Sequence, residues 1–168
     1  MFQTKIKTQT YLWGCVLFVL GWLLLAGSGC TREEVVLVLK QQAANTYVFD
    51  DLAGNVRITI YNTPNSYDIT VVNGPGSVIG CAIRNHADPG TIYFSDAYIK
   101  KGGAETQSSS TKGLPVGGKM ELKLVLYKST VSSAIYQAIE ALGLDFWDGI
   151  KKYKENIAEE YYSVFVLE

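Results

Sequence analysis

The stretch VRITIY, residues 56–61, is the part of the chain that most directly decides the fold. Its valine and two isoleucines alternate with an arginine, a threonine and a tyrosine. This is the period-two pattern of a strand with one face on a core and the other toward water. The turn residues NTPNS follow at 62–66, and residues 67–72 return to strand character. We therefore expect a β-hairpin here.

Strand signals recur on both sides of this hairpin at intervals of about ten residues. The sequences GPG at 74–76 and DPG at 88–90 place Pro and Gly where tight turns need them. The β-branched run VVLVL at 35–39 is typical of a buried strand. The other predicted strands are residues 46–49, 78–83, 91–95, 119–127 and 161–167. Such spacing predicts an antiparallel sandwich or barrel.

Before the last predicted strand, the apolar spacing changes to a helical period. Ser129 or Thr130 can cap a helix near residues 130–142, and Asp145 can cap a second one near residues 145–158. Because strand character returns afterwards, the helical pair is an excursion from the sheet. The expected fold class is mainly β (α+β), an antiparallel β-sandwich with a two-helix excursion before the last strand.

The start of the chain has the organisation of a secretory signal peptide, assigned to residues 1–29. Lys5 and Lys7 precede an apolar run at 11–26, and the small residues GSG lead directly into Cys30. A cysteine directly after small residues resembles the lipobox of bacterial lipoproteins. The resemblance covers about a fifth of the chain.

The resemblance implies that Cys30 becomes an acylated N-terminus, carrying palmitate, and anchors a single domain of residues 30–168. It also implies a cell-envelope location facing the periplasm or exterior. Since Thr31 and not Asp follows the cysteine, the outer membrane is the expected destination where a cell has one. Two alternatives stay open: cleavage by an ordinary signal peptidase, with release of the protein, or an uncut membrane anchor. All three place the domain outside the cytoplasm.

Charge and cysteine content argue against several classes of protein. The chain has 15 Lys and Arg against 16 Asp and Glu, and without Lys5 and Lys7 the remainder is acidic. This balance argues against a nucleic-acid partner. Beyond Cys30 the chain has one cysteine, Cys81, so we expect a small buried thiol and no internal disulfide. One histidine and one cysteine fall short of a zinc site, and we expect no metal and no cofactor.

The histidine offers the one catalytic hypothesis. His86 lies in the turn RNHAD at 84–88 and could form an orienting dyad with Asp88. A periplasmic or surface hydrolase would use such a pair to activate a nucleophile. No Gly-x-Ser-x-Gly or comparable motif accompanies it, so a polar turn is the favoured interpretation and no catalytic residue is assigned.

A Gly- and Ser-rich segment, residues 102–118, lacks periodicity and is expected to be a flexible loop. Leu114, Pro115 and Val116 are apolar residues within it. We expect these three to form a tip that can dock into a partner.

Tyrosines on the central strands are a second candidate contact surface. Tyr61 and Tyr93, if they face outward, offer a large contact area at low entropy cost. We therefore expect a lipid-anchored, non-enzymatic binding or assembly module whose partners are the membrane and another envelope protein. The type VI secretion outer-membrane lipoprotein is an architectural analogy and suggests a secretion or surface complex. A carbohydrate- or lipid-binding module that uses the tyrosine face is an alternative, beside the hydrolase.

Overall fold

The computed structural model describes residues 34–168. Its strands are β1 (Val36–Leu39), β2 (Thr46–Leu52), β3 (Val56–Thr63), β4 (Ser66–Val72), β5 (Ile79–Asn85), β6 (Ile92–Ile99), β7 (Ala104–Ser109), β8 (Met120–Tyr127) and β9 (Ile157–Leu167). Its helical elements are η1 (Ala53–Asn55), α2 (Ser133–Glu140), η2 (Gly143–Asp145), α3 (Phe146–Gly149) and η3 (Ile150–Asn156). Within residues 34–168, no helix has the length and hydropathy needed to cross a bilayer. The predicted signal peptide and Cys30 lie outside the described residues.

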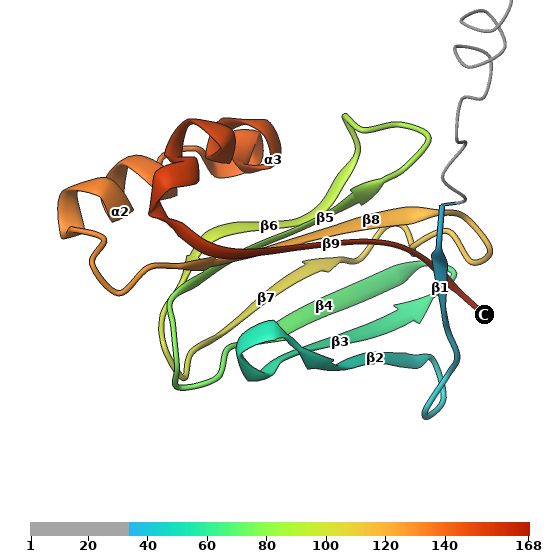
Figure 1. Ribbon diagram of the computed structural model, residues 1–168. Helices are drawn as coiled ribbons and strands as arrows, with labels where there is room; N and C mark the ends of the chain where they lie inside the picture. The colour runs from blue at the N-terminus through green and yellow to red at the C-terminus, as the bar shows by residue number, and fades with distance from the viewer. Residues whose placement is uncertain (1–33) are drawn as a thin grey trace, which may run out of the picture. The chain divides into compact units, whose positions relative to one another are not determined.

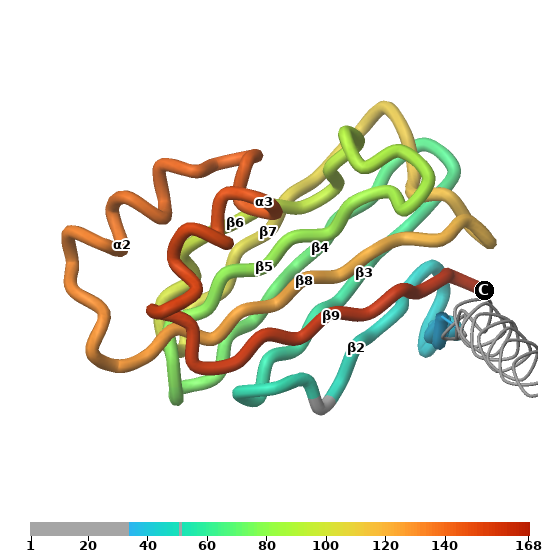
Figure 2. Tube along the Cα trace, turned by 45° about the horizontal axis from the view of Figure 1, so that its top comes forward, coloured from blue at the N-terminus to red at the C-terminus, as the bar shows by residue number. Residues whose placement is uncertain are grey.

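The strands form two sheets that pack face to face (Figures 1 and 2). One sheet has the order β1-β9-β8-β5-β6, and the other has the order β2-β3-β4-β7. Neighbouring strands are antiparallel except β1 and β9, which run parallel with Val36 opposite Val164. The helical elements lie between β8 and β9 in the chain. The predicted β-sandwich with a helical excursion before the last strand is therefore confirmed.

Alternation along β3 generates the core as the sequence predicts. Val56, Ile58 and Ile60 are buried between the sheets, whereas Arg57 and Tyr61 are exposed. The same rule operates on every strand that faces the interior. Each fully buried branched or aromatic side chain contributes about 1.5–3 kcal/mol relative to an exposed one.

The outer face of the five-stranded sheet is covered by the helical segment. Phe146, Ile150 and Ile139 pack with Val125 of β8 in a second apolar cluster. Gly80 of β5 makes this approach possible, because a Cβ there would lie 2.7 Å from the ring of Phe146. As a result β8 is buried on both faces along its whole length.

The predicted helices are shorter than expected. The first begins at Ser133, capped by the Ser132 hydroxyl, which accepts a hydrogen bond from the Ile135 N–H. The second predicted helix, near residues 145–158, is helical over Phe146–Asn156 but is not one continuous α-helix. That segment is one turn of α-helix followed by a 3₁₀ helix, in which Tyr153 leaves helical geometry. Glycine at 149 has weak helix propensity, and packing on the sheet decides the path.

The prediction of a flexible loop over residues 102–118 is wrong for its first half. That part forms β7, an edge strand of the four-stranded sheet. Its hydroxyl-rich sequence hides the strand pattern, but Thr106 and Thr70 share a 2.9 Å hydrogen bond across the pair. The Gln107 side chain also bonds both the backbone N–H and the carbonyl of Ser95, which ties β7 to the edge strand β6 of the other sheet.

Candidate functional site

A cluster of charged side chains lies on the outer face of the five-stranded sheet. In β5 and β8, Arg84 is directly opposite Glu121. Odd-numbered positions of β8 point away from the core, because the even positions Met120, Leu122, Leu124 and Leu126 fill it. The alternation that buries the leucines therefore brings Glu121 and Lys123 under the helical segment.

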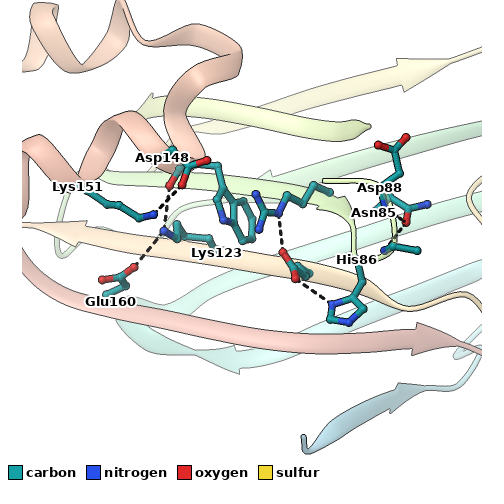
Figure 3. A network of polar contacts seen from close by, with 11 residues as sticks. Asn85, His86, Asp88, Lys123, Asp148, Lys151 and Glu160 are labelled. Carbon is teal, nitrogen blue, oxygen red and sulfur yellow. Dashed lines mark hydrogen bonds and ion pairs between the residues drawn. The ribbon is translucent and has the colours of Figure 1, made fainter. Parts of the chain in front are cut away.

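Glu121 is the centre of this cluster, because it contacts both Arg84 and His86. Figure 3 shows the polar network in which His86 and Lys123 lie. The Glu121 side chain is only 8% exposed, and Arg84 Nε donates to Oε2 at 2.5 Å. The other carboxylate oxygen, Oε1, lies 2.9 Å from Nδ1 of His86. One nearly buried carboxylate thus fixes a guanidinium and an imidazole at the same time. A charge-assisted pair of this kind is roughly twice as strong as a neutral hydrogen bond.

Trp147 closes the cluster from the side of the helical segment. The Arg84 guanidinium carbon lies 4.0 Å from the centroid of its ring, a cation–π contact. Lys123 Nζ lies 5.2 Å from the same ring, donates to the Trp147 carbonyl at 3.0 Å and pairs with Glu160 at 3.3 Å. Trp147 also meets the exposed ring of Tyr162 in an edge-on contact. The strand pair and the helical segment are therefore joined through charged groups as well as through apolar packing.

The charged cluster can orient the His86 imidazole, but its remaining contacts join parts of the fold to one another. A carboxylate that holds Nδ1 is the usual means of positioning a histidine for proton transfer. Here the same carboxylate also neutralises Arg84, a residue of β5 whose guanidinium lies over the Trp147 ring. The groups bound in the cluster are side chains and carbonyls of β5, β8, β9 and α3. What they do together is fasten α3 to the sheet.

The predicted dyad of His86 and Asp88 is not formed. Asp88 Oδ2 accepts a hydrogen bond from the Thr91 hydroxyl, and Asn85 Oδ1 accepts from the N–H groups of Ala87 and Asp88. Figure 3 shows Asp88 turned away from the imidazole. Asp88 therefore stabilises the turn after β5, and the hydrolase hypothesis that used it loses its geometry.

Sequence reasoning missed Glu121 and Lys123. Glu121 lies 35 positions after His86 in the chain and Lys123 lies two further on, so no local motif joins them to it. A usable signal was nevertheless present, because both interrupt an otherwise apolar strand, MELKLVLY. Charged side chains on a strand that is buried on both faces must find partners.

The two tyrosines named from the sequence lie on different surfaces. Tyr93 points into the sandwich, where its hydroxyl accepts from Asn85 Nδ2 at 3.0 Å and its ring meets Tyr67 edge-on. The expectation that Tyr93 faces outward is therefore wrong. Tyr61 lies on the outer face of the four-stranded sheet and is 41% exposed.

The three apolar residues predicted to form a docking tip in the loop before β8 differ in their exposure to solvent. Leu114 is 5% exposed and belongs to the main core, so it is not available at a tip. The Asn62 side chain holds it there, accepting from the Leu114 N–H at 2.7 Å and donating to its carbonyl at 3.2 Å. Pro115 is half-buried, and Val116 is exposed.

The outer face of the four-stranded sheet carries mostly hydroxyl groups. A row of threonines runs across it, with Thr59 opposite Thr70 and Thr70 opposite Thr106. Exposed Tyr61 stands on one side of this row and exposed Val72 on the other. We call this surface the threonine face, defined by Thr59, Tyr61, Thr70, Val72 and Thr106.

Metal and thiol chemistry find no support in the described part of the chain. Residues 34–168 contain no group of three His, Cys, Asp or Glu side chains placed to hold a metal ion. Cys81 is fully buried in the core, and burial raises the pKa of its thiol well above the ordinary value. A protonated, inaccessible thiol is not a nucleophile.

Comparison of the chain with protein-family models, curated proteins and solved structures gives no match.

Proposed function

We propose that this protein is a lipid-anchored component of the cell envelope whose β-sandwich is a non-enzymatic binding module for another envelope protein. The anchor is the acylated Cys30, and the partner is bound on the threonine face. A surface or secretion assembly is the setting that suits such a module.

The observation that carries the proposal is the difference between the outer faces of the two sheets. The five-stranded sheet has its outer face covered by α2, α3 and the 3₁₀ segments. The threonine face has no such cover within the described residues, and it exposes Tyr61 and Val72 among short hydroxyl side chains. A rigid sheet with an accessible aromatic ring and many hydrogen-bonding groups is suited to recognition.

The proposal is supported by what the charged cluster does. Glu121 is held between Arg84 and His86, and Lys123 is held between Trp147 and Glu160. These contacts are used to join the helical segment to the sheet. A scaffold fixed in this way presents its opposite face without rearrangement, which lowers the entropy cost of binding.

An acyl anchor would also lower the affinity that the threonine face needs for its protein partner. A protein confined to a membrane meets a neighbour in the same membrane at high effective concentration. A face of modest apolar content, such as one tyrosine and one valine among threonines, is then sufficient for stable association.

The test of the binding face is photo-crosslinking in native membranes from a photoreactive phenylalanine at position 61. A matched control carries the same group at position 162, where Tyr162 is exposed on the other sheet. We expect a distinct protein to be captured from position 61 and not from position 162, and Tyr61→Ala to weaken its recovery. Identical products from both positions would contradict the proposal. Capture of a polysaccharide instead would establish the carbohydrate-binding alternative.

The test of the anchor is separate. Metabolic labelling with a palmitate analogue should mark the wild type and not Cys30→Ser, and the labelled protein should fractionate with membranes. Cys81→Ser serves as the control, because the Cys81 side chain is buried and its loss should leave labelling unchanged. An unlabelled wild-type protein would refute the lipid anchor.

A further inference from the structure

Strand β1 exposes apolar side chains that its sequence suggests should be buried. The apolar run VVLVL at 35–39 predicts a strand in the interior of a sheet, yet β1 forms the edge of the five-stranded sheet. Val35, just before the strand, is 86% exposed, and Leu37 and Val38 are 40% and 42% exposed. Leu39 alone of these residues is buried. The prediction of a buried strand is therefore wrong, and an apolar ridge is left at the surface.

We define the β1 ridge as Val35, Leu37 and Val38. Because side chains alternate along a strand, Leu37 and Val38 point to opposite sides of the sheet edge. The ridge is consequently not one flat face but an apolar rim. Natural edge strands are usually protected by charged residues or proline, and β1 has neither between Val36 and Leu39.

The position of the ridge in the chain identifies what can cover it. Val35 is five positions after Cys30, and an extended chain spans at most about 3.3–3.6 Å per residue. If Cys30 carries the acyl chain, Val35 stays within about 18 Å of the bilayer surface whatever path the chain takes. A membrane is then always next to the ridge, whereas any protein partner would have to reach it.

We propose that the β1 ridge rests in the headgroup region of the bilayer to which Cys30 is attached, so that the sandwich lies on the membrane edge-first. This inference rests on the lipid anchor proposed above. We expect lipid, and not a strand from another chain, to cover the β1 ridge. The reason is that β1 is only four residues long and offers a short template for strand addition.

The same geometry limits how deep the ridge can go. The outer edge of β1 carries backbone N–H and C=O groups that would be unsatisfied in hydrocarbon. Exposed Glu34 and Lys40 flank the ridge on either side. Contact is therefore confined to the interfacial region, where water and headgroups satisfy the backbone while the valine and leucine side chains leave water.

This contact would fix the orientation of the domain. Strand β1 is at one edge of its sheet, and β6, against which the η2 helix packs, is at the other. With β1 on the bilayer, the helical segment over β6, including Leu144 of η2, points away from it. Figure 1 shows β1 and the helices at opposite ends of the domain.

The test uses the full-length acylated protein in vesicles of phosphatidylethanolamine and phosphatidylglycerol. A polarity-sensitive fluorophore is attached to Val35→Cys, and the matched control carries it at Leu144→Cys, which replaces another exposed apolar residue. Cys81 is buried, so it does not compete for the label. Lipids with a nitroxide near the headgroup serve as quenchers.

We expect the emission of the probe at 35 to shift to the blue and to be quenched by the nitroxide lipid. The probe at 144 should keep the emission of a water-exposed group in the same vesicles. The variant Leu37→Asp should reduce the shift at position 35 without releasing the protein from the vesicles.

Three results would overturn the inference. If the protein sediments with vesicles but both probes report water, the anchor stands and the ridge does not touch lipid. If the probe at 35 shifts but is not quenched, the ridge is covered by protein, for instance a second copy. If the protein is not acylated and does not sediment, the proposed anchor fails and the inference fails with it.

Discussion

Replacing Glu121 is the sharpest test of the idea that the charged cluster holds the helical segment on the sheet. The variant Glu121→Leu keeps a similar volume but leaves Arg84, whose side chain is 17% exposed, without its carboxylate. Removing one member of a buried ion pair costs about 3–5 kcal/mol, because the remaining charge stays desolvated. The cation–π contact with Trp147 compensates for only part of this loss, since such contacts contribute about 0.5–2 kcal/mol.

We expect the lower end of that range, about 3 kcal/mol, because Arg84 and His86 retain some contact with water. For a domain of this size the loss corresponds to a fall in Tm of roughly 10–15 °C. The assay is thermal and urea unfolding of the full-length protein in detergent, followed by far-UV circular dichroism.

The control is the double variant Arg84→Met/Glu121→Leu. Methionine keeps an unbranched stem against Trp147 while it removes the charge, so most of the stability should return. A recovery of at least about 1.5 kcal/mol over the single variant would measure the coupling between the two residues. If Glu121→Leu lowers stability by less than about 0.5 kcal/mol, or if the double variant is no better, the reasoning is refuted.

Three further predictions concern close packing and the core. Gly80→Ala should destabilise the fold by about 1–3 kcal/mol, because its Cβ would lie 2.7 Å from Phe146, whereas Gly76→Ala, with nothing within 4 Å, should be near neutral in urea melts. Asn62→Ala should cost about 1–3 kcal/mol and speed proteolysis of the loop before β8, since two buried backbone groups lose their partner; unchanged digestion would contradict this. Burial raises the pKa of the Cys81 thiol in the folded protein above its ordinary value of 9.0, so above that pH unfolding releases a proton and the free energy of unfolding should fall as pH rises. Cys81→Ala should reduce this fall of stability with pH, and Cys81 in the folded protein should not react with thiol reagents.

The sandwich could be predicted because its main signals are local. Alternation in β3 and proline–glycine turns at 74–76 and 88–90 depend on residues that are neighbours in the chain. Strand β7 was missed because serine and threonine stabilise an edge strand by hydroxyl pairs across it, a contact that hydrophobic periodicity does not register. The 3₁₀ segment after α3 was missed because its path is set by packing of Ile150 in the second apolar cluster, against residues from other elements.

The candidate site was less predictable, for a physical reason. Glu121 lies 35 positions from His86, and the strand register alone brings the two together. Burial of Tyr93 and Leu114 likewise depends on partners from other strands, Tyr67 and Asn62. Exposure of β1 follows from its place at the edge of the sheet, and strand order cannot be read from residue type. Lipidation of Cys30 remains a prediction.

The position of β9 between β1 and β8 has a consequence for biogenesis. Strand β1 has its neighbour in the sheet in β9, the eleven residues Ile157–Leu167, more than a hundred positions later in the chain. During synthesis or translocation from the N-terminus, β1 must wait until Ile157–Leu167 has emerged, and closure of long loops makes such pairings slow. A chain truncated before Ile157 would leave β1 and one edge of β8 unsatisfied together. Completion of the five-stranded sheet therefore requires residues Ile157–Leu167, and a product that lacks them would be open to proteases and aggregation.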